Sequence, residues 1–293
     1  MDGVIVVDKA PGWTSHDVVN KVRRIAGTQR VGHLGTLDPA ATGVLPVVIG
    51  KATRLAQFYI RSDKIYEGTV RFGWATTTYD GEGEATGERC EVTIDAGELE
   101  GALDEFRGEI QQTPPPVSAK RVGGKRAYEL ARKQVAVELE PVKIHIYELE
   151  LIALEGPAAR LRVHCSGGTY VRAIAHDLGQ RLGCGAHLEE LRRLASAEFE
   201  IAQARTVEQL QVLGAEDRLV DALVPARALL PGLPDVYVDE AAVRDIRNGK
   251  NFAASPFRAH PEARQVKAIT RDGELVAIGE AVLPNVYHPS VVL

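Results

Sequence analysis

Residues 31–43 read Val-Gly-His-Leu-Gly-Thr-Leu-Asp-Pro-Ala-Ala-Thr-Gly, and they place one carboxylate, that of Asp38, in a turn of small residues just ahead of an apolar strand. The glycines of this stretch allow positive φ angles and close backbone approach, while Pro39 restricts the residue before it to extended or turn geometry. Such a loop can bring a substrate against its backbone. An isolated Asp-Pro loop is more often a tight turn whose carboxylate caps its own backbone, so these residues alone leave both interpretations open.

The composition indicates a folded protein with a large core. The chain has 293 residues, 45% of them hydrophobic, which predicts one large domain and a small appendage. Residues 1–8 carry a four-residue apolar run without a basic lead, which predicts a first strand and not a secretory signal, and no stretch is long enough to span a bilayer. The three cysteines lack a C-x-x-C spacing, which argues against a disulfide framework and against a zinc site. We therefore expect a cytoplasmic protein that needs no metal and no membrane.

The charged residues are unevenly distributed along the chain. The net charge of −5 is unfavourable for nucleic-acid binding, because phosphate neutralisation supplies most of the sequence-independent affinity. Residues 20–30 nevertheless hold four basic side chains and no acidic one, and residues 117–133 hold six basic side chains against one glutamate. A basic run is usually a solvated helix face, but two runs that flank the Asp38 loop would suit contact with RNA.

Hydrophobic periodicity predicts a mixture of helices and strands. The capping box Thr14-x-x-Asp17 starts a helix that Gly27 can end, and the punctuation at residues 231–234 predicts a domain boundary. We expect helices at 16–26, 52–60, 96–106, 127–133, 171–182 and 187–194, strands at 44–49, 65–73, 143–153, 159–165, 236–238, 266–271 and 275–283, an exposed loop at 75–88 and a basic loop at 118–126.

The pattern Gly-His-x-Gly-Thr-Leu-Asp-Pro-x-Ala-x-Gly at residues 32–43 resembles the signature of the TruB-type pseudouridine synthases, which isomerise a uridine in the T-loop of transfer RNA. The resemblance implies an α+β pseudouridine synthase fold with a largely antiparallel central sheet over residues 1–230, and a small C-terminal β-rich PUA-like domain over residues 231–293. It also implies activity on position 55 of tRNA and contacts with the T-loop and the acceptor stem. Neither a cofactor nor an obligatory protein partner is expected.

The resemblance assigns the catalytic roles to three residues. Asp38 stands where the family carries its nucleophilic aspartate, and Arg172, in Gly-Thr-Tyr-Val-Arg, matches the arginine that pairs with it. Tyr66 matches the tyrosine that stacks on the flipped base and acts in proton transfer. From the residues alone, Tyr66 would be ordinary strand core and Arg172 a surface residue of a helix.

Further positions are expected to contact the RNA. His33 corresponds to the family histidine that lies beside the displaced base, although a lone histidine among glycines could equally satisfy a buried hydrogen bond. Tyr170 and Leu191 fall on positions that line the pocket. Lys9, in Asp-Lys-Ala-Pro-Gly, resembles the Lys-Pro-x-Gly motif of the family, with the proline one place further on.

The basic segment of about residues 114–133 is expected to bind RNA phosphates. The family pattern Ser-Ala-x-Lys reads Ser-Ala-Lys-Arg from residue 118, so Lys120 precedes an arginine, Arg121, at the usual lysine position. A phosphate-binding role survives this exchange, although an arginine presents its donors in a different geometry. Lys125 and Arg126 match the family pattern without such a change.

Three other functions remain open at this stage. The chain could be a non-catalytic RNA-binding or RNA-folding protein on the same scaffold, or an enzyme of the related type that works with guide RNA and protein partners. It could also be a hydrolase that cleaves the glycosidic bond, but that reaction needs a positioned water and usually a second carboxylate, for which no paired motif is visible.

Overall fold

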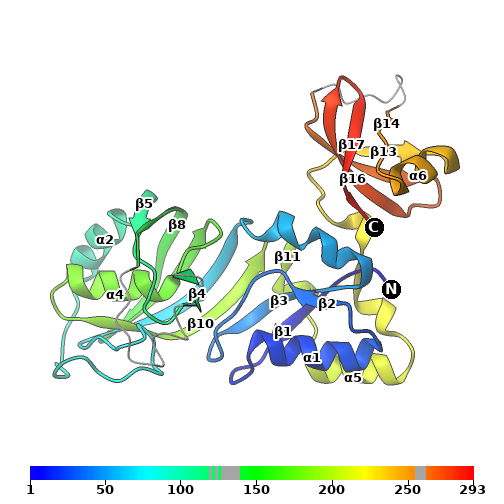
Figure 1. The fold of residues 1–293 in the computed structure, drawn as a ribbon. Coiled ribbons are helices and arrows are strands. Elements are labelled where there is room, and N and C mark those ends of the chain that lie inside the picture. Colours follow the sequence, from blue (N-terminus) through cyan, green and yellow to red (C-terminus); the bar gives the residue numbers. More distant parts are fainter. Residues whose placement is uncertain (119–120, 123–124, 127–138, 255–261) are drawn as a thin grey trace.

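The computed structural model describes residues 1–118, 121–122, 125–126, 139–254 and 262–293, and within these ranges the chain forms two sheets and a short hairpin (Figure 1). The strands of the larger sheet are β1 (Gly3–Lys9), β2 (Val31–His33), β3 (Thr42–Ile49), β4 (Lys64–Phe72), β5 (Gly108–Gln112), β8 (Val142–Glu155), β9 (Ala158–Cys165), β10 (Ala186–Ser196), β11 (Phe199–Glu200) and β12 (Leu223–Pro225). Their order is β12-β1-β3-β10-β4-β9-β8-β5, with β2 on β3 and β11 on β10. All of these pairs are antiparallel except β3 with β10, which confirms the predicted α+β architecture.

The helices of this part of the chain lie in two groups. They are α1 (Ser15–Ala26), α2 (Ala96–Asp104), α4 (Val171–Arg181) and α5 (Val207–Ala215), with the 3-10 helices η1 (Gly50–Tyr59), η2 (Ile201–Gln203), η3 (Leu219–Ala222) and η4 (Ala226–Ala228). Figure 1 shows α1 and α5 side by side below β1 and β3, and α2 with α4 at the opposite end of the sheet. Among the described helices, none combines the length and the apolar composition that crossing a bilayer requires.

The helix α1 begins and ends as the sequence predicts. The Thr14 hydroxyl accepts a hydrogen bond from the Asp17 amide at 3.1 Å, and the Asp17 carboxylate accepts one from the Thr14 amide at 2.9 Å. Gly27 closes the helix in the left-handed conformation, with φ of 62°, and its N–H donates to the Arg23 carbonyl. These caps fix the helix directly after the chain leaves β1.

The strand β1 is buried on both faces, which explains its continuous apolar run. Ile5 and Val7 belong to the core that α1 and α5 cover, whereas Val4 and Val6 belong to a second core on the other face of the sheet. Because side chains alternate across a strand, a strand between two cores needs apolar residues at every position. The second core includes Leu55 of η1.

The smaller sheet packs onto this second core. Its elements are β13 (Asp235–Val238), α6 (Glu240–Arg247), β14 (Phe252–Ala253), β15 (Gln265–Thr270), β16 (Leu275–Leu283) and β17 (Val286–Val292), and its strand order is β13-β15-β16-β17-β14. Ile269, Leu275 and Ile278 of the smaller sheet belong to one buried cluster with two residues of the larger part of the chain. These are Val48 of β3 and Leu55 of η1. The cluster is continuous and apolar, so the small β domain is docked on the large one.

The helix predicted at residues 187–194 is wrong, because these residues form the strand β10. Leu188 and Leu191 are three residues apart, a spacing that places two side chains on one face of a helix, and it therefore predicted a helix in place of a strand. The strand has register irregularities between Leu188 and Glu190 and between Arg193 and Ala195. Each bulge inserts a residue and interrupts the alternation by which a strand is recognised.

Two other predicted segments differ in part. Residues 52–60 form the 3-10 helix η1 and not an α-helix. The segment 75–88, predicted as an exposed loop, is irregular but contains the buried Thr76 and the largely buried Asp80 carboxylate. The helix predicted at 127–133 lies outside the described residues.

The parallel pairing of β3 with β10 depends on Gly43. This residue has φ of 97°, and a Cβ atom built on it would lie 2.2 Å from the Arg193 carbonyl oxygen. We expect Gly43→Ala to reduce the free energy of unfolding by more than about 3 kcal/mol, because backbone strain and a backbone clash add together. Urea unfolding measures this loss.

The matched control is Gly12→Ala. Gly12 has φ of 80°, but a Cβ atom there would meet nothing within 4 Å. The control carries conformational strain without a clash, which costs about 1–2 kcal/mol. Equal losses in the two variants would contradict the role of close packing at Gly43.

Candidate active site

The loop between β2 and β3, which carries Asp38, is held by a buried lysine. Lys9, at the end of β1, is 0% exposed, and its ammonium donates to the backbone carbonyls of Ala10 at 3.0 Å, Trp13 at 2.8 Å and Pro39 at 2.9 Å. Burial lowers the pKa of Lys9 to about 8, although the nearby Asp38 carboxylate opposes this shift. A buried ammonium needs such acceptors, and here the loop itself supplies one of them.

A buried arginine holds the other half of the same loop. Arg193 of β10 is 1% exposed, and its guanidinium donates to the carbonyls of Val44 at 2.7 Å, Thr36 at 3.3 Å and Gly35 at 3.1 Å. The Ser15 hydroxyl holds Leu37, the residue before Asp38. It donates to the Leu37 carbonyl at 3.0 Å and accepts from the Leu37 amide at 2.9 Å. The backbone on both sides of Asp38 is therefore fixed without regular secondary structure.

The Asp38 carboxylate faces outward and forms an ion pair with Arg172. The Asp38 Oδ2 atom lies 2.9 Å from the Arg172 Nε atom. The Asp38 side chain is 41% exposed, whereas that of Arg172, in the first turn of α4, is 7% exposed. The remaining guanidinium nitrogens donate to the carbonyls of Thr78 and Val117, both at 3.0 Å. Arg172 is thus immobilised on one side and presents its Nε–H to an accessible carboxylate.

Asp80 completes this arrangement, although the sequence analysis did not single it out. Its Oδ2 atom lies 3.3 Å from Arg172 Nη1, and its side chain is only 15% exposed. Its Oδ1 atom accepts hydrogen bonds from the Thr78 hydroxyl and from the Glu82 amide. A Gly- and Thr-rich segment without periodicity predicted an exposed loop, and only a contact between distant residues could have revealed this role.

Tyr66 lies beside the buried arginine. In the sheet it pairs with Arg193 across β4 and β10, and its side chain belongs to the main core. Burial raises the pKa of the Tyr66 hydroxyl, while the positive charge of Arg193 acts in the opposite direction. The phenol, the Asp38 loop and the cation beneath that loop therefore form one connected site.

Comparisons with known proteins match this chain along most of its length. A family model described as the TruB family pseudouridylate synthase N-terminal domain matches residues 23–171, and one described as the tRNA pseudouridylate synthase B C-terminal domain matches residues 172–231. The chain belongs to the TruB family of pseudouridylate synthases, which are isomerases.

Individual proteins of the family are similar over the full chain. The tRNA pseudouridine synthase B of Solibacter usitatus is 71% identical over 293 residues, which are 100% of both chains. The tRNA pseudouridine synthase B of Pseudomonas fluorescens is 42% identical over 285 residues, 96% of this chain and 92% of that protein.

Two solved structures have a similar fold. A Cbf5-Nop10-Gar1 complex matches with a TM-score of 0.72 and 29% identity over 97% of this chain and 79% of that chain. An H/ACA RNP bound to a substrate RNA containing 2'-deoxyuridine matches with a TM-score of 0.73 and 27% identity, over 99% and 84% of the two chains. The pseudouridine synthase fold expected from the signature is therefore present.

Three further residues of this TruB family member, Tyr170, His33 and Leu191, are predicted to lie near the target base, and they come from three different elements. Tyr170 occupies the N-cap position of α4 without a capping hydrogen bond from its side chain, and the buried Gln112 side chain binds both its amide, at 2.8 Å, and its carbonyl, at 3.1 Å. His33 ends β2, half-buried, and its Nδ1 accepts from the Gly35 amide at 3.3 Å, while burial lowers its pKa. Leu191 is partly buried on β10, a strand and not the expected helix.

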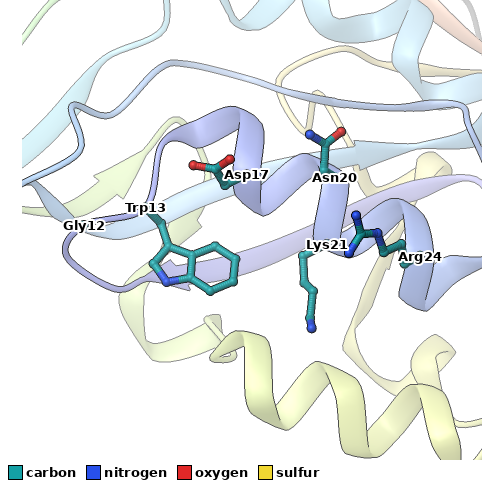
Figure 2. Close-up of a pocket in the computed structure, with 6 residues that line it drawn as sticks. All are labelled: Gly12, Trp13, Asp17, Asn20, Lys21 and Arg24. Atoms are coloured by element: carbon teal, nitrogen blue, oxygen red, sulfur yellow. The ribbon is translucent and has the colours of Figure 1, made fainter.

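Among the basic residues of α1, Arg23 is bound within the fold, whereas Lys21 and Arg24 lie at a surface cavity. Arg23 binds Asn20 and the Val31 carbonyl within the fold. Lys21 and Arg24 instead line a shallow cavity of about 430 Å³ beside α1, and Figure 2 shows Lys21 extending from the same side of the helix as the Trp13 indole.

The second basic segment is described only in part. Arg121 and Lys125 belong to the hairpin of β6 (Arg121–Val122) and β7 (Lys125–Arg126), in which Arg121 pairs with Arg126. Lys120 lies outside the described residues. Across the parts of the chain that are described, no group of three or more His, Cys, Asp or Glu side chains could hold a metal ion.

The burial of Lys9 predicts a pH dependence of stability. Its pKa is about 8 in the folded chain and 10.5 ordinarily, so the unfolded chain binds more protons between these values. Stability contributed by this site therefore rises as the pH rises from about 8 to about 10.5. We expect the difference in unfolding free energy between the native chain and Lys9→Met to grow across this interval in urea titrations.

The same titration of Lys143→Met, which replaces an exposed lysine that is paired with Glu109, is the control for the loss of a surface lysine. If the difference for Lys9→Met changes no more across the interval than the difference for Lys143→Met, the pKa of Lys9 is not lowered by burial.

Proposed function

We propose that the chain converts uridine to pseudouridine at position 55 in the T-loop of tRNA, with Asp38 as the reacting carboxylate. The observation that carries this proposal is the Asp38–Arg172 pair, in which a half-exposed carboxylate rests against an immobilised guanidinium. The names of the similar proteins support tRNA as the substrate.

The reaction breaks the N1–C1′ glycosidic bond, turns the base and forms a C5–C1′ bond, while the hydrogen leaves C5 and N1 gains one. No electrons are exchanged with a cofactor, so a carboxylate that forms a transient bond or stabilises the separated base and sugar is sufficient. Asp38 can serve in this way because its loop is rigid and its carboxylate is accessible. Tyr66 is proposed to move the C5 proton. Burial raises the pKa of its hydroxyl, and the charge and the hydrogen bond of Arg193 act against this rise.

The target uridine must leave its stack before it reaches Asp38. Extrusion of a base costs on the order of a few kcal/mol, which new contacts must offset. We propose that Tyr66, Tyr170 and Leu191 enclose the extruded base and that His33 occupies the space beside it. These residues come from four different elements around one loop.

Phosphate contacts are assigned to the available basic residues. We propose that Lys120, Arg121, Lys125 and Arg126 bind the T-arm backbone, and that Lys21 and Arg24 extend this surface along α1. Lys9 has no accessible ammonium, so its contribution is to hold the carbonyls of Trp13 and Pro39 in place. Contact of the small β domain with the acceptor stem remains part of the same proposal, as does action in the cytoplasm, where tRNA is processed.

A glycosidic hydrolase is the less favoured alternative. The second carboxylate near Asp38 belongs to Asp80, and both of its oxygens already accept hydrogen bonds from Thr78, Glu82 and Arg172. It is therefore poorly placed to activate a water. A guide-dependent enzyme is also less favoured, because the basic composition of residues 114–133 supports RNA contacts made by the chain itself.

Replacing Asp38 tests the chemistry directly. We expect Asp38→Asn to lower isomerisation by more than about a thousandfold, the scale of removing a catalytic group, with little change in RNA affinity. Release of tritium from C5-labelled uridine in a tRNA transcript measures turnover, and filter binding measures affinity. Asp272→Asn, on an exposed turn, serves as the control. Sustained turnover by Asp38→Asn would refute the proposed role.

The choice of RNA tests the substrate. A transcript of the T-arm hairpin alone should be modified by the purified chain, whereas a hairpin of the anticodon arm should not be, because the site must recognise the folded T-loop. Mapping of pseudouridine in both transcripts after incubation reports the result. Modification of the two hairpins at equal rates, or a requirement for an added guide RNA, would contradict the proposal.

A further inference from the structure

The segment that carries Asp80 lies between α4 and β10. We call residues 76–81 the Asp80 segment. The Thr76 hydroxyl donates to the Asp80 carbonyl at 2.7 Å, which closes the segment on itself. Leu188 of β10 binds it twice, because its amide donates to the Tyr79 carbonyl and its carbonyl accepts from the Gly81 amide, both at 3.0 Å.

The opposite side of the Asp80 segment meets α4 at two points. Arg172 binds the Thr78 carbonyl and the Asp80 carboxylate, as described above. One turn further along α4, the ring of His176 stacks on the ring of Tyr79, with 3.7 Å between centroids and 8° between planes. Residues four apart share one face of a helix, so both contacts come from the same side of α4.

The stack is accompanied by two unfavourable features. Tyr79 has φ of 66°, in the left-handed region that residues with a Cβ atom rarely adopt. His176 Nδ1 is buried and has no hydrogen-bond partner among the described residues. Burial also lowers the pKa of His176, so the ring is neutral near pH 7. The unpaired His176 Nδ1 atom therefore does not hold the ring in place, and the flat faces of the two rings supply the contact between Tyr79 and His176.

We propose that the Tyr79–His176 stack is a positioning contact that holds Asp80 against Arg172 and thereby aims the Arg172 Nε–H at Asp38. Without the stack, the left-handed Tyr79 keeps only its backbone hydrogen bonds with Leu188 and Thr76, and the Thr78 carbonyl and the Asp80 carboxylate can move together. Arg172 would then lose acceptors on the side away from Asp38. The stacked rings themselves need not touch the RNA.

This inference rests on the proposed function only for its effect on rate, so its test has one readout that is independent of activity. Hydrogen exchange of the Gly81 and Leu188 amides reports how firmly the Asp80 segment is held on β10 in the free protein. The single-turnover rate on tRNA reports whether the Arg172 Nε–H is correctly placed against Asp38. RNA affinity reports whether the altered residues contact the substrate.

The variants separate the ring face from the other properties of the histidine. His176→Ala removes the ring, and His176→Phe keeps a flat ring but no nitrogen. Tyr79→Gly removes the partner ring while making the left-handed conformation easier. Gln180→Ala, at an exposed position of α4, is the control.

We expect His176→Ala and Tyr79→Gly to speed exchange of both amides and to slow turnover by about tenfold, near the upper end of what an aromatic pair contributes, with RNA affinity unchanged. His176→Phe should restore both properties. The inference is overturned if His176→Phe behaves like His176→Ala, if exchange is unaffected, or if RNA affinity falls while the rate is kept. If the native chain shows no turnover but the exchange pattern holds, the positioning contact stands and the proposed function fails.

Discussion

The site depends on two buried cations that donate hydrogen bonds to backbone carbonyls of the loop that carries Asp38. Lys9 and Arg193 are almost completely removed from water, and a charge in that position is tolerated only where acceptors surround it. The loop, in turn, has carbonyls that no strand can pair. The two cations gain hydrogen-bond acceptors from the loop, and the loop carbonyls gain hydrogen-bond donors from the cations. The result is a rigid loop without regular structure, as the role proposed for Asp38 requires.

The second half of the site comes from a separate element. Arg172 projects from α4, and its guanidinium is held by the Asp80 segment and by the Val117 carbonyl before it reaches Asp38. The large sheet connects the two halves, since β10 carries Arg193 under the loop and also contacts α4. Small errors in the packing of α4 on this sheet would therefore change the distance between the guanidinium and the carboxylate.

Local signals in the sequence predicted much of the fold. The Thr14–Asp17 capping box, the apolar run of β3 and the alternation of β4 are properties of neighbouring residues, and the structure confirms each. The strand β10 was missed because two bulges interrupt its alternation. The signature around Asp38 indicated the family, but the sequence could not show why its backbone is rigid. Lys9, Arg193 and Asp80 each bind at least one partner far away in the chain, and no local pattern encodes such contacts.

The parallel pair of β3 and β10 has a consequence for how the protein matures. The hydrogen bond from Arg193 to Val44 joins residues 149 positions apart, so the loop and its support meet only after about two-thirds of the chain has left the ribosome. Until then, the start of β3 at Thr42 and Gly43 lacks its neighbour and presents an open strand edge, which is a site for mispairing during synthesis. Assembly of the candidate site is thus a late step that requires β10, and a chain that stops before β10 would contain Asp38 without the support of Arg193.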